Sequence, residues 1–224
     1  MKLRPYIIIL LLFALMTSGI TAQIIITTPY EFSAGISGGT TFSSVTFSPR
    51  VSQGTLAGST FGLTGRMTMG ENVGLQLELN YAQQGWDEVY ETMPEYRYSR
   101  RLDYLQMPFY THVRFGGKKV NGFIHAGPQI GYLLNESTNE SVGENKPGNV
   151  DVRHDMPVEN RLEWGISGGA GIELCTGIGC FSLEGRYYYS FGDIYGTQRK
   201  DYFSKASSQV ISAKITYLIP FLQR

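Results

Sequence analysis

A strict alternation of apolar and polar residues over unusually long segments is the feature that most restricts the fold of this chain. In residues 104–115 the odd-numbered series is largely apolar and comprises Leu105, Met107, Phe109, Thr111, Val113 and Phe115. The even-numbered series is more polar and comprises Tyr104, Gln106, Pro108, Tyr110, His112 and Arg114. A period of two residues indicates a two-faced β-strand, and membrane strands need about 9–11 residues where soluble strands average about five or six. We therefore expect the odd series to face lipid and the even series to face the inside of a barrel.

The same alternation recurs along the chain, and we expect eight strands at residues 31–42, 58–69, 73–85, 102–115, 120–134, 161–174, 179–191 and 207–222. Short connections at 70–72, 116–119 and 175–179 alternate with long ones at 43–57, 86–101, 135–160 and 192–206. Bacterial outer-membrane barrels have an even number of strands, short periplasmic turns and longer extracellular loops. The sequence therefore predicts an all-β fold, an eight-stranded antiparallel transmembrane up-and-down β-barrel with four extracellular loops. A soluble sandwich or lipocalin is the alternative, and it would leave many large apolar residues exposed without a reason.

The start of the chain has the pattern of an export signal. Lys2 and Arg4 precede an apolar run from Tyr6 to Met16, and small residues follow up to Ala22. This pattern predicts a signal peptide at residues 1–22, cleaved after Ala22, and an outer-membrane barrel domain at 23–224. An uncleaved anchor helix is the alternative, but the apolar run is shorter than the roughly 20 residues that a helical span needs.

Composition excludes several classes of function. The formal net charge is zero, so the chain lacks the basic character of a nucleic-acid-binding protein. The mean hydropathy of −0.13 is compatible with a membrane barrel, because barrels place apolar residues at every second position rather than in blocks. No nucleotide-binding, zinc or esterase motif is present, so we expect no cofactor and no enzymatic activity. The expected partners are outer-membrane lipid and envelope proteins that contact the extracellular loops.

Charged residues on the inward series are the main candidate site. They are four acids and four bases, namely Arg66, Glu78, Arg114, Glu163, Glu173, Glu184, Arg186 and Lys214. The interior of an eight-stranded barrel is just wide enough to be filled by side chains, and an unpaired buried charge is costly. We therefore predict a salt-bridge network that closes the lumen. A narrow pore is the alternative.

Three further features carry specific expectations. His112 and His125 lie inward on adjacent strands, either as polar core residues or as the site of a lipid-modifying enzyme. Cys175 and Cys180 flank a turn, where they form either a hairpin disulfide or two free thiols. Pro108 removes a ladder hydrogen bond, so we expect a local bulge or a solvent-filled kink.

Loop composition suggests contacts outside the cell. The 86–101 segment mixes tyrosines with arginines, and the 135–160 segment is acidic. The first suits protein, glycan or headgroup contact. The second suits divalent cations, a basic partner or simple solvation. Trp86 and Trp164 fall at the outer end of their strands, where they are expected to form part of an aromatic girdle.

Four segments resemble one family. They are Tyr104–Tyr110 (YLQMPFY), Gly127–Tyr132 (GPQIGY), Gly168–Glu173 (GGAGIE) and Glu184–Ser190 (EGRYYYS), and they are similar to the PorT-like outer-membrane β-barrel family of Bacteroidota. The resemblance implies an eight-stranded barrel in the outer membrane, in a family whose members mostly have no assigned activity. PorT itself takes part in type IX protein secretion, but no residue here marks that role. The ending Phe221-Leu-Gln-Arg224 departs from the terminal aromatic residue usual in barrels.

The sequence thus favours a small barrel with a side-chain-filled lumen and a structural or interaction role through its extracellular loops. A transport-class role, as a narrow pore or as an accessory component of protein secretion, is the alternative. A lipid-modifying enzyme at the histidines is a weaker third hypothesis.

Overall fold

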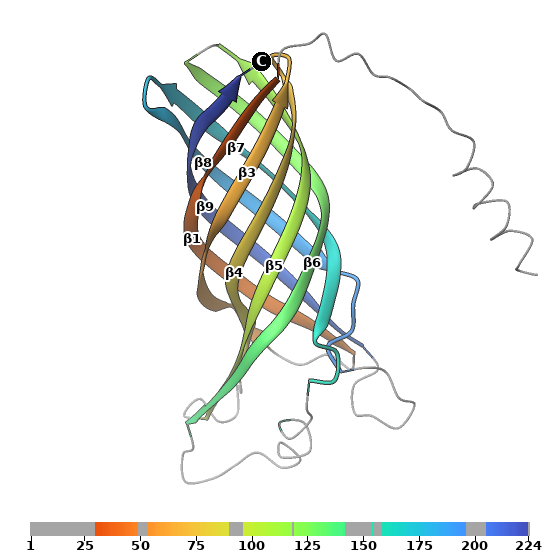
Figure 1. Ribbon diagram of the computed structural model, residues 1–224. Coiled ribbons are helices and arrows are strands. Elements are labelled where there is room, and N and C mark those ends of the chain that lie inside the picture. Colours follow the sequence, from red (N-terminus) through yellow and green to blue (C-terminus); the bar gives the residue numbers. More distant parts are fainter. Residues whose placement is uncertain are drawn as a thin grey trace, which may run out of the picture.

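The computed structural model shows a ring of antiparallel strands that closes on itself (Figure 1). It describes residues 30–48, 53–89, 96–117, 119–141, 154, 158–195 and 205–223. The expected signal peptide at residues 1–22 lies outside these ranges. The described strands are β1 (Tyr30–Ser48), β2 (Gln53–Gly54), β3 (Leu56–Met69), β4 (Val73–Val89), β5 (Arg97–Gly116), β6 (Val120–Ser141), β7 (Leu162–Thr176), β8 (Gly179–Ser190) and β9 (Lys205–Gln223).

Eight long strands form the wall, and β2 is a two-residue addition that pairs with the end of β4. The long strands pair in chain order from β1 and β3 through to β9, and β9 pairs with β1 to complete the ring. Pairing is antiparallel throughout the described residues. The prediction of an all-β, eight-stranded, up-and-down barrel is confirmed. No helix in the described ranges is long and apolar enough to cross a membrane.

Short turns and long connections lie at opposite ends of the barrel. Residues 70–72 and 177–178 form short turns at the end that also holds the end of β9 (Figure 1). Gly70 has a φ of 64°, a left-handed conformation that glycine adopts without a steric penalty. The connections after β1, β4, β6 and β8 leave from the other end. Because short turns are periplasmic in bacterial barrels, the long connections are extracellular.

The two faces of the wall have opposite chemistry. The outside carries apolar side chains between 44% and 62% exposed, among them Ile36, Leu63, Leu77, Phe109, Ile130, Ile172, Leu183 and Ile215. The inside carries polar side chains at most 2% exposed, among them Gln76, Glu78, His112, Ser167, Glu173 and Lys214. This arrangement inverts that of a soluble protein. It is the arrangement expected of a wall that lipid surrounds, with all backbone groups paired between strands.

Several strands extend further toward the extracellular side than predicted. β1 runs to Ser48, β4 to Val89 and β6 to Ser141, whereas β5 already begins at Arg97. The loops predicted at 43–57, 86–101 and 135–160 are correspondingly shorter. In β5 and β6 the extension has polar residues on its outer face, so the hydrophobic alternation ends while the backbone ladder continues.

Pro108 does not cause the predicted bulge. The register between β4 and β5 is the same on both sides of it, with Leu77 opposite Phe109 and Asn80 opposite Gln106. The register shift of β5 instead falls between Asp103 and Tyr104, in its pairing with β6. A proline without an N–H therefore interrupts the ladder here without inserting a residue.

Trp86 also differs from the prediction. Trp164 is 54% exposed on the outer surface, as a girdle residue should be, but Trp86 is only 2% exposed. Even-numbered residues of β4, such as Gln84 and Glu88, are buried, and Trp86 keeps that parity. It therefore points into the barrel, and its assignment to the girdle was wrong.

Candidate functional site: the closed lumen

Glu78 of β4 is the centre of the lumen charges. Arg186 of β8 donates to it, with Nη2 2.6 Å from Oε1, and Lys214 of β9 places Nζ 3.0 Å from Oε2. Arg186 also pairs with Glu184 on its own strand. In the ring, β4 lies well away from β8 and β9, so these ion pairs cross the lumen rather than follow the wall.

A second group of charges is linked to the first. Glu173 of β7 pairs with Arg66 of β3 and lies 3.5 Å from Arg114 of β5. Arg66 Nε donates to Gln76 Oε1 at 2.8 Å, and the Gln76 amide donates in turn to Glu78. Seven of the eight predicted network residues therefore form one connected layer, in which opposite charges offset the cost of burial.

Glu163 stands apart from this layer. It is 5% exposed and accepts a hydrogen bond from Gln84 Nε2 at 2.7 Å. Among the described residues no basic side chain pairs with it. The expectation that all eight charges join one network is therefore wrong for Glu163.

His112 and His125 face each other across β5 and β6, with ring centroids 6.2 Å apart. Tyr110 stacks on His125 at 4.3 Å, and Phe123 lies 4.8 Å from His112. Within the described residues no hydrogen bond joins either imidazole to a serine. Ser137, the serine nearest in sequence, pairs with Arg101 in the outer part of β6. In the described part of the chain, His112 and His125 therefore form no His–Ser pair of the kind a lipid-modifying enzyme would use.

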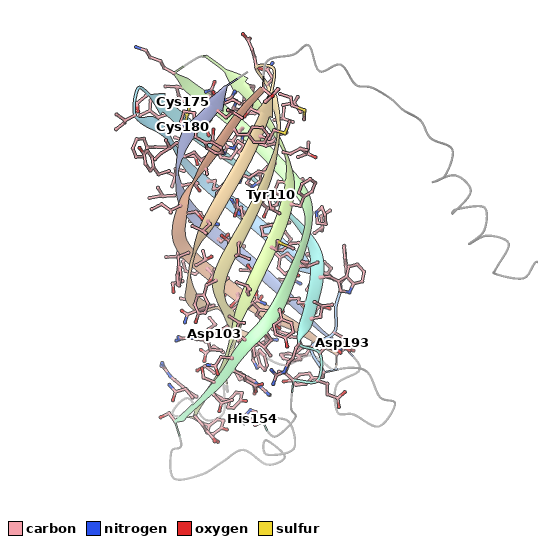
Figure 2. The ribbon with its side chains drawn as sticks, viewed as in Figure 1. Asp103, Tyr110, His154, Cys175, Cys180 and Asp193 are labelled. Atoms are coloured by element: carbon pink, nitrogen blue, oxygen red, sulfur yellow. A yellow bond between two sulfur atoms is a disulfide. The ribbon has the colours of Figure 1, made fainter. Side chains whose placement is uncertain are left out.

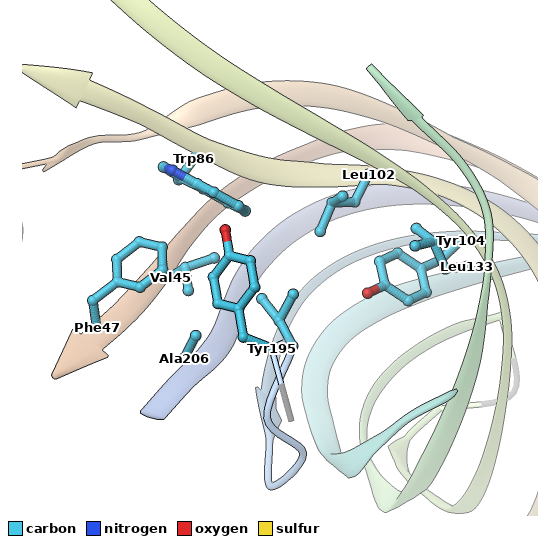
Figure 3. Close-up of a cluster of buried hydrophobic side chains, with 9 residues drawn as sticks. Val45, Phe47, Trp86, Leu102, Tyr104, Leu133, Tyr195 and Ala206 are labelled. Atoms are coloured by element: carbon cyan, nitrogen blue, oxygen red, sulfur yellow. The ribbon is translucent and has the colours of Figure 1, made fainter. Parts of the chain in front are cut away.

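An apolar cluster that sequence analysis missed closes the extracellular end. It comprises Val45, Phe47, Trp86, Leu102, Tyr104, Leu133, Ile194, Tyr195 and Ala206 (Figure 3). Its residues come from five strands and from the segment after β8, whose Tyr195 ring lies beside those of Phe47 and Trp86. The sequence did contain a pattern that indicates this cluster. The inward parity of three strands continues past the membrane with apolar residues, namely Val45, Phe47, Trp86 and Leu102. We call this set the outer cap.

Arg100 links residues of the outer cap through cation–π contacts, a hydrogen bond and an ion pair. Its guanidinium lies 5.7 Å from the ring centroids of both Trp86 and Tyr195, donates to the Tyr195 hydroxyl at 3.1 Å and pairs with Glu136. Burial raises the pKa of the Tyr195 hydroxyl, an effect that the Arg100 charge only partly offsets. The tyrosine therefore stays neutral and accepts the hydrogen bond from Arg100.

Between the outer cap and the charged layer lies a cavity of about 30 Å³. Its lining is largely polar and includes Thr41, Asn80, Gln106, Gln129 and Lys214. A water molecule needs about 10–15 Å³ of such volume, so the cavity holds a few waters at most.

Cys175 and Cys180 are directly opposite each other in the β7–β8 hairpin, and their sulfur atoms are bonded. They lie at the periplasmic end (Figure 2). Glu173 is close enough to form a potential metal site with them, but bonded sulfurs are not thiolate ligands.

We expect denatured, unreduced protein to show no reaction with a maleimide reagent, and reduced protein to react at Cys175 and Cys180. Replacing both by serine should lower the free energy of unfolding by at most about 2 kcal/mol, because the closed loop is short. Urea unfolding in lipid vesicles measures this change. Thiol labelling before reduction would contradict the disulfide.

Outside the membrane, the outer ends of β4 and β5 contact His154. The His154 ring stacks on Tyr98 with centroids 3.4 Å apart, and its Nε2 lies 3.2 Å from Glu88 Oε2. The acidic residues at 144, 151 and 155 lie outside the described ranges.

Comparison with known proteins agrees with this architecture. OprG from Pseudomonas aeruginosa has a TM-score of 0.52 and 11% identity, over 87% of this chain and 96% of that one. Neisserial surface protein A (12% identity, TM-score 0.47) covers 85% of this chain and 97% of its own. Ail of Yersinia pestis (13% identity, TM-score 0.42) covers 84% and 99%. At these identities the likeness to OprG shows the fold alone.

No curated protein matches the sequence significantly. A family model described as an outer membrane protein beta-barrel domain matches residues 21–196, which is most of the chain. The chain therefore belongs to the outer membrane β-barrel domain family and is a protein of the outer membrane.

Proposed function

We propose that this protein is a non-enzymatic structural or interaction barrel that presents its extracellular segments to envelope partners. The double closure of the lumen carries this proposal. The Glu78 layer and the outer cap obstruct the interior at two levels, and the cavity between them holds only about 30 Å³. A solute path through the barrel would have to break both.

The paired outer ends of β4, β5 and β6 are the proposed contact surface. Arg97 pairs in register with Val89 on one side and with Ser141 on the other, so the sheet continues beyond the outer cap (Figure 1). Arg97, Arg101 and Asn139 are exposed there. A surface built on paired strands is more rigid than a loop, which lowers the entropic cost of binding.

Planar-bilayer recording and affinity capture test the proposal. The purified barrel should show no steady conductance, and Arg101→Glu should lose partners that the wild type captures from cross-linked envelopes. Lys119→Glu, in a periplasmic turn, is the matched charge reversal and should keep them. Stable single-channel currents, or equal capture by both variants, would contradict it.

The sequence segments described above support a finer proposal, that the chain is a PorT-like barrel exported through a signal peptide at residues 1–22. An accessory role in protein secretion is then the alternative function. Stable co-purification of secretion components with the wild type and with Arg101→Glu alike would favour that alternative.

A further inference from the structure

Glu163 is the one acid of the predicted lumen set that the structure leaves without a basic partner in the described residues. Its Oε2 accepts from Gln84, but its Oε1 has no hydrogen-bond partner. A buried carboxylate in this state is strongly unfavourable unless something else supplies a positive charge.

A small cavity lies against this carboxyl group. It measures about 10 Å³ and lies between the start of β7 and the end of β8. Its lining is mixed, with polar side chains beside two apolar ones, and consists of Tyr104, Asn160, Leu162, Glu163, Ser190, Gly192, Asp193 and Ile194. The volume is that of a single water-sized particle.

The polar residues of this lining are suited to binding a cation. The carboxyl groups of Glu163 and Asp193, two hydroxyl groups and one side-chain amide all offer oxygen ligands, and no basic residue is among the lining residues. Hard divalent cations such as Ca²⁺ prefer such oxygen ligands and need two negative charges for neutrality.

The Asp193 carboxylate is positioned by hydrogen bonds from two backbone N–H groups. Its Oδ1 accepts from the backbone N–H groups of Tyr195 and Ala206, at 3.2 and 3.0 Å. The same residue thus contacts two members of the outer cap, Tyr195 and Ala206, and lines the cavity beside Glu163.

We propose that Glu163, with Asp193 and Ser190, binds one calcium ion at the extracellular end of the lumen. The ion neutralises the unpaired carboxylate and ties β7 to the segment after β8. This site is separate from the contact surface proposed above, and either proposal can fail without the other.

The test uses the folded mature barrel in detergent, with Ca²⁺ itself as the probe. Saturating Ca²⁺ should raise the midpoint of heat unfolding by about 5 °C relative to EDTA, followed as the loss of the fast-migrating folded form on gels. Glu163→Gln should abolish this shift and should be at least as stable as the wild type in EDTA, because it removes the unpaired charge.

Glu159→Gln is the matched control, since it removes the same charge from an exposed position nearby. It should keep the full Ca²⁺ shift. Calorimetric titration with CaCl₂ should give one site in the wild type and none in Glu163→Gln. An unchanged wild-type midpoint, or an equal shift in Glu163→Gln, would overturn the proposal and leave Glu163 as a protonated acid.

Discussion

Glu78→Ala is expected to destabilise the folded barrel by about 3–5 kcal/mol, because it removes the anion that two buried cations share. Among the described residues Lys214 would keep a hydrogen bond to Asn80 Oδ1, at 3.1 Å, and Arg186 would keep its ion pair with Glu184. Urea unfolding in lipid vesicles gives the free-energy difference directly. Glu71→Ala, at an exposed periplasmic turn, should change stability little.

A double variant distinguishes the loss of the ion pair from a general loss of packing in the lumen. Replacing both Glu78 and Lys214 by methionine removes opposite charges together, so it should be more stable than Glu78→Ala alone. If Glu78→Ala instead unfolds at the same urea concentration as the wild type, the ion pairs of Glu78 contribute nothing to stability.

Trp86→Ala is expected to cost about 3–5 kcal/mol, because it empties the middle of the outer cap. Phe47 packs edge-on against its ring at 5.2 Å, and Arg100 lies over it. Trp164→Ala is the control, since its side chain faces lipid and an equal loss there would contradict a special role for the cap.

Conductance distinguishes the two closures from each other. Trp86→Ala opens the outer end only, so the charged layer should still prevent steady current through a planar bilayer. Combining it with Glu78→Ala should produce measurable conductance. Current through either single variant would show that one closure alone seals the lumen.

Much of this fold follows from the period of two in the sequence. The membrane-facing residues and the inward charges could be predicted because lipid imposes one rule on every strand at the same depth. Beyond the membrane that rule ends, so the outer extensions of β1, β4, β5 and β6 could not be seen. The outer cap was missed for the same reason, although the parity of Trp86 and Leu102 already pointed inward.

The separate position of Glu163 shows what a list of inward charges leaves out. Glu163 and Glu173 share one face of β7, but ten residues of strand separate them by about 33 Å. Parity gives the face of a residue, whereas partners depend on height along the barrel. Height follows from register, as when Glu163 lies opposite Gly131 and Glu173 opposite Asn121.

The pairing of β1 with β9 has a consequence for assembly. The two strands that must meet are the first and last described along the chain, and they join over eighteen residue pairs. Contacts between such distant parts of a chain form slowly. Until they form, both strands keep unpaired edges that could join a neighbouring molecule. During biogenesis this protein is therefore prone to aggregation until β9 pairs with β1.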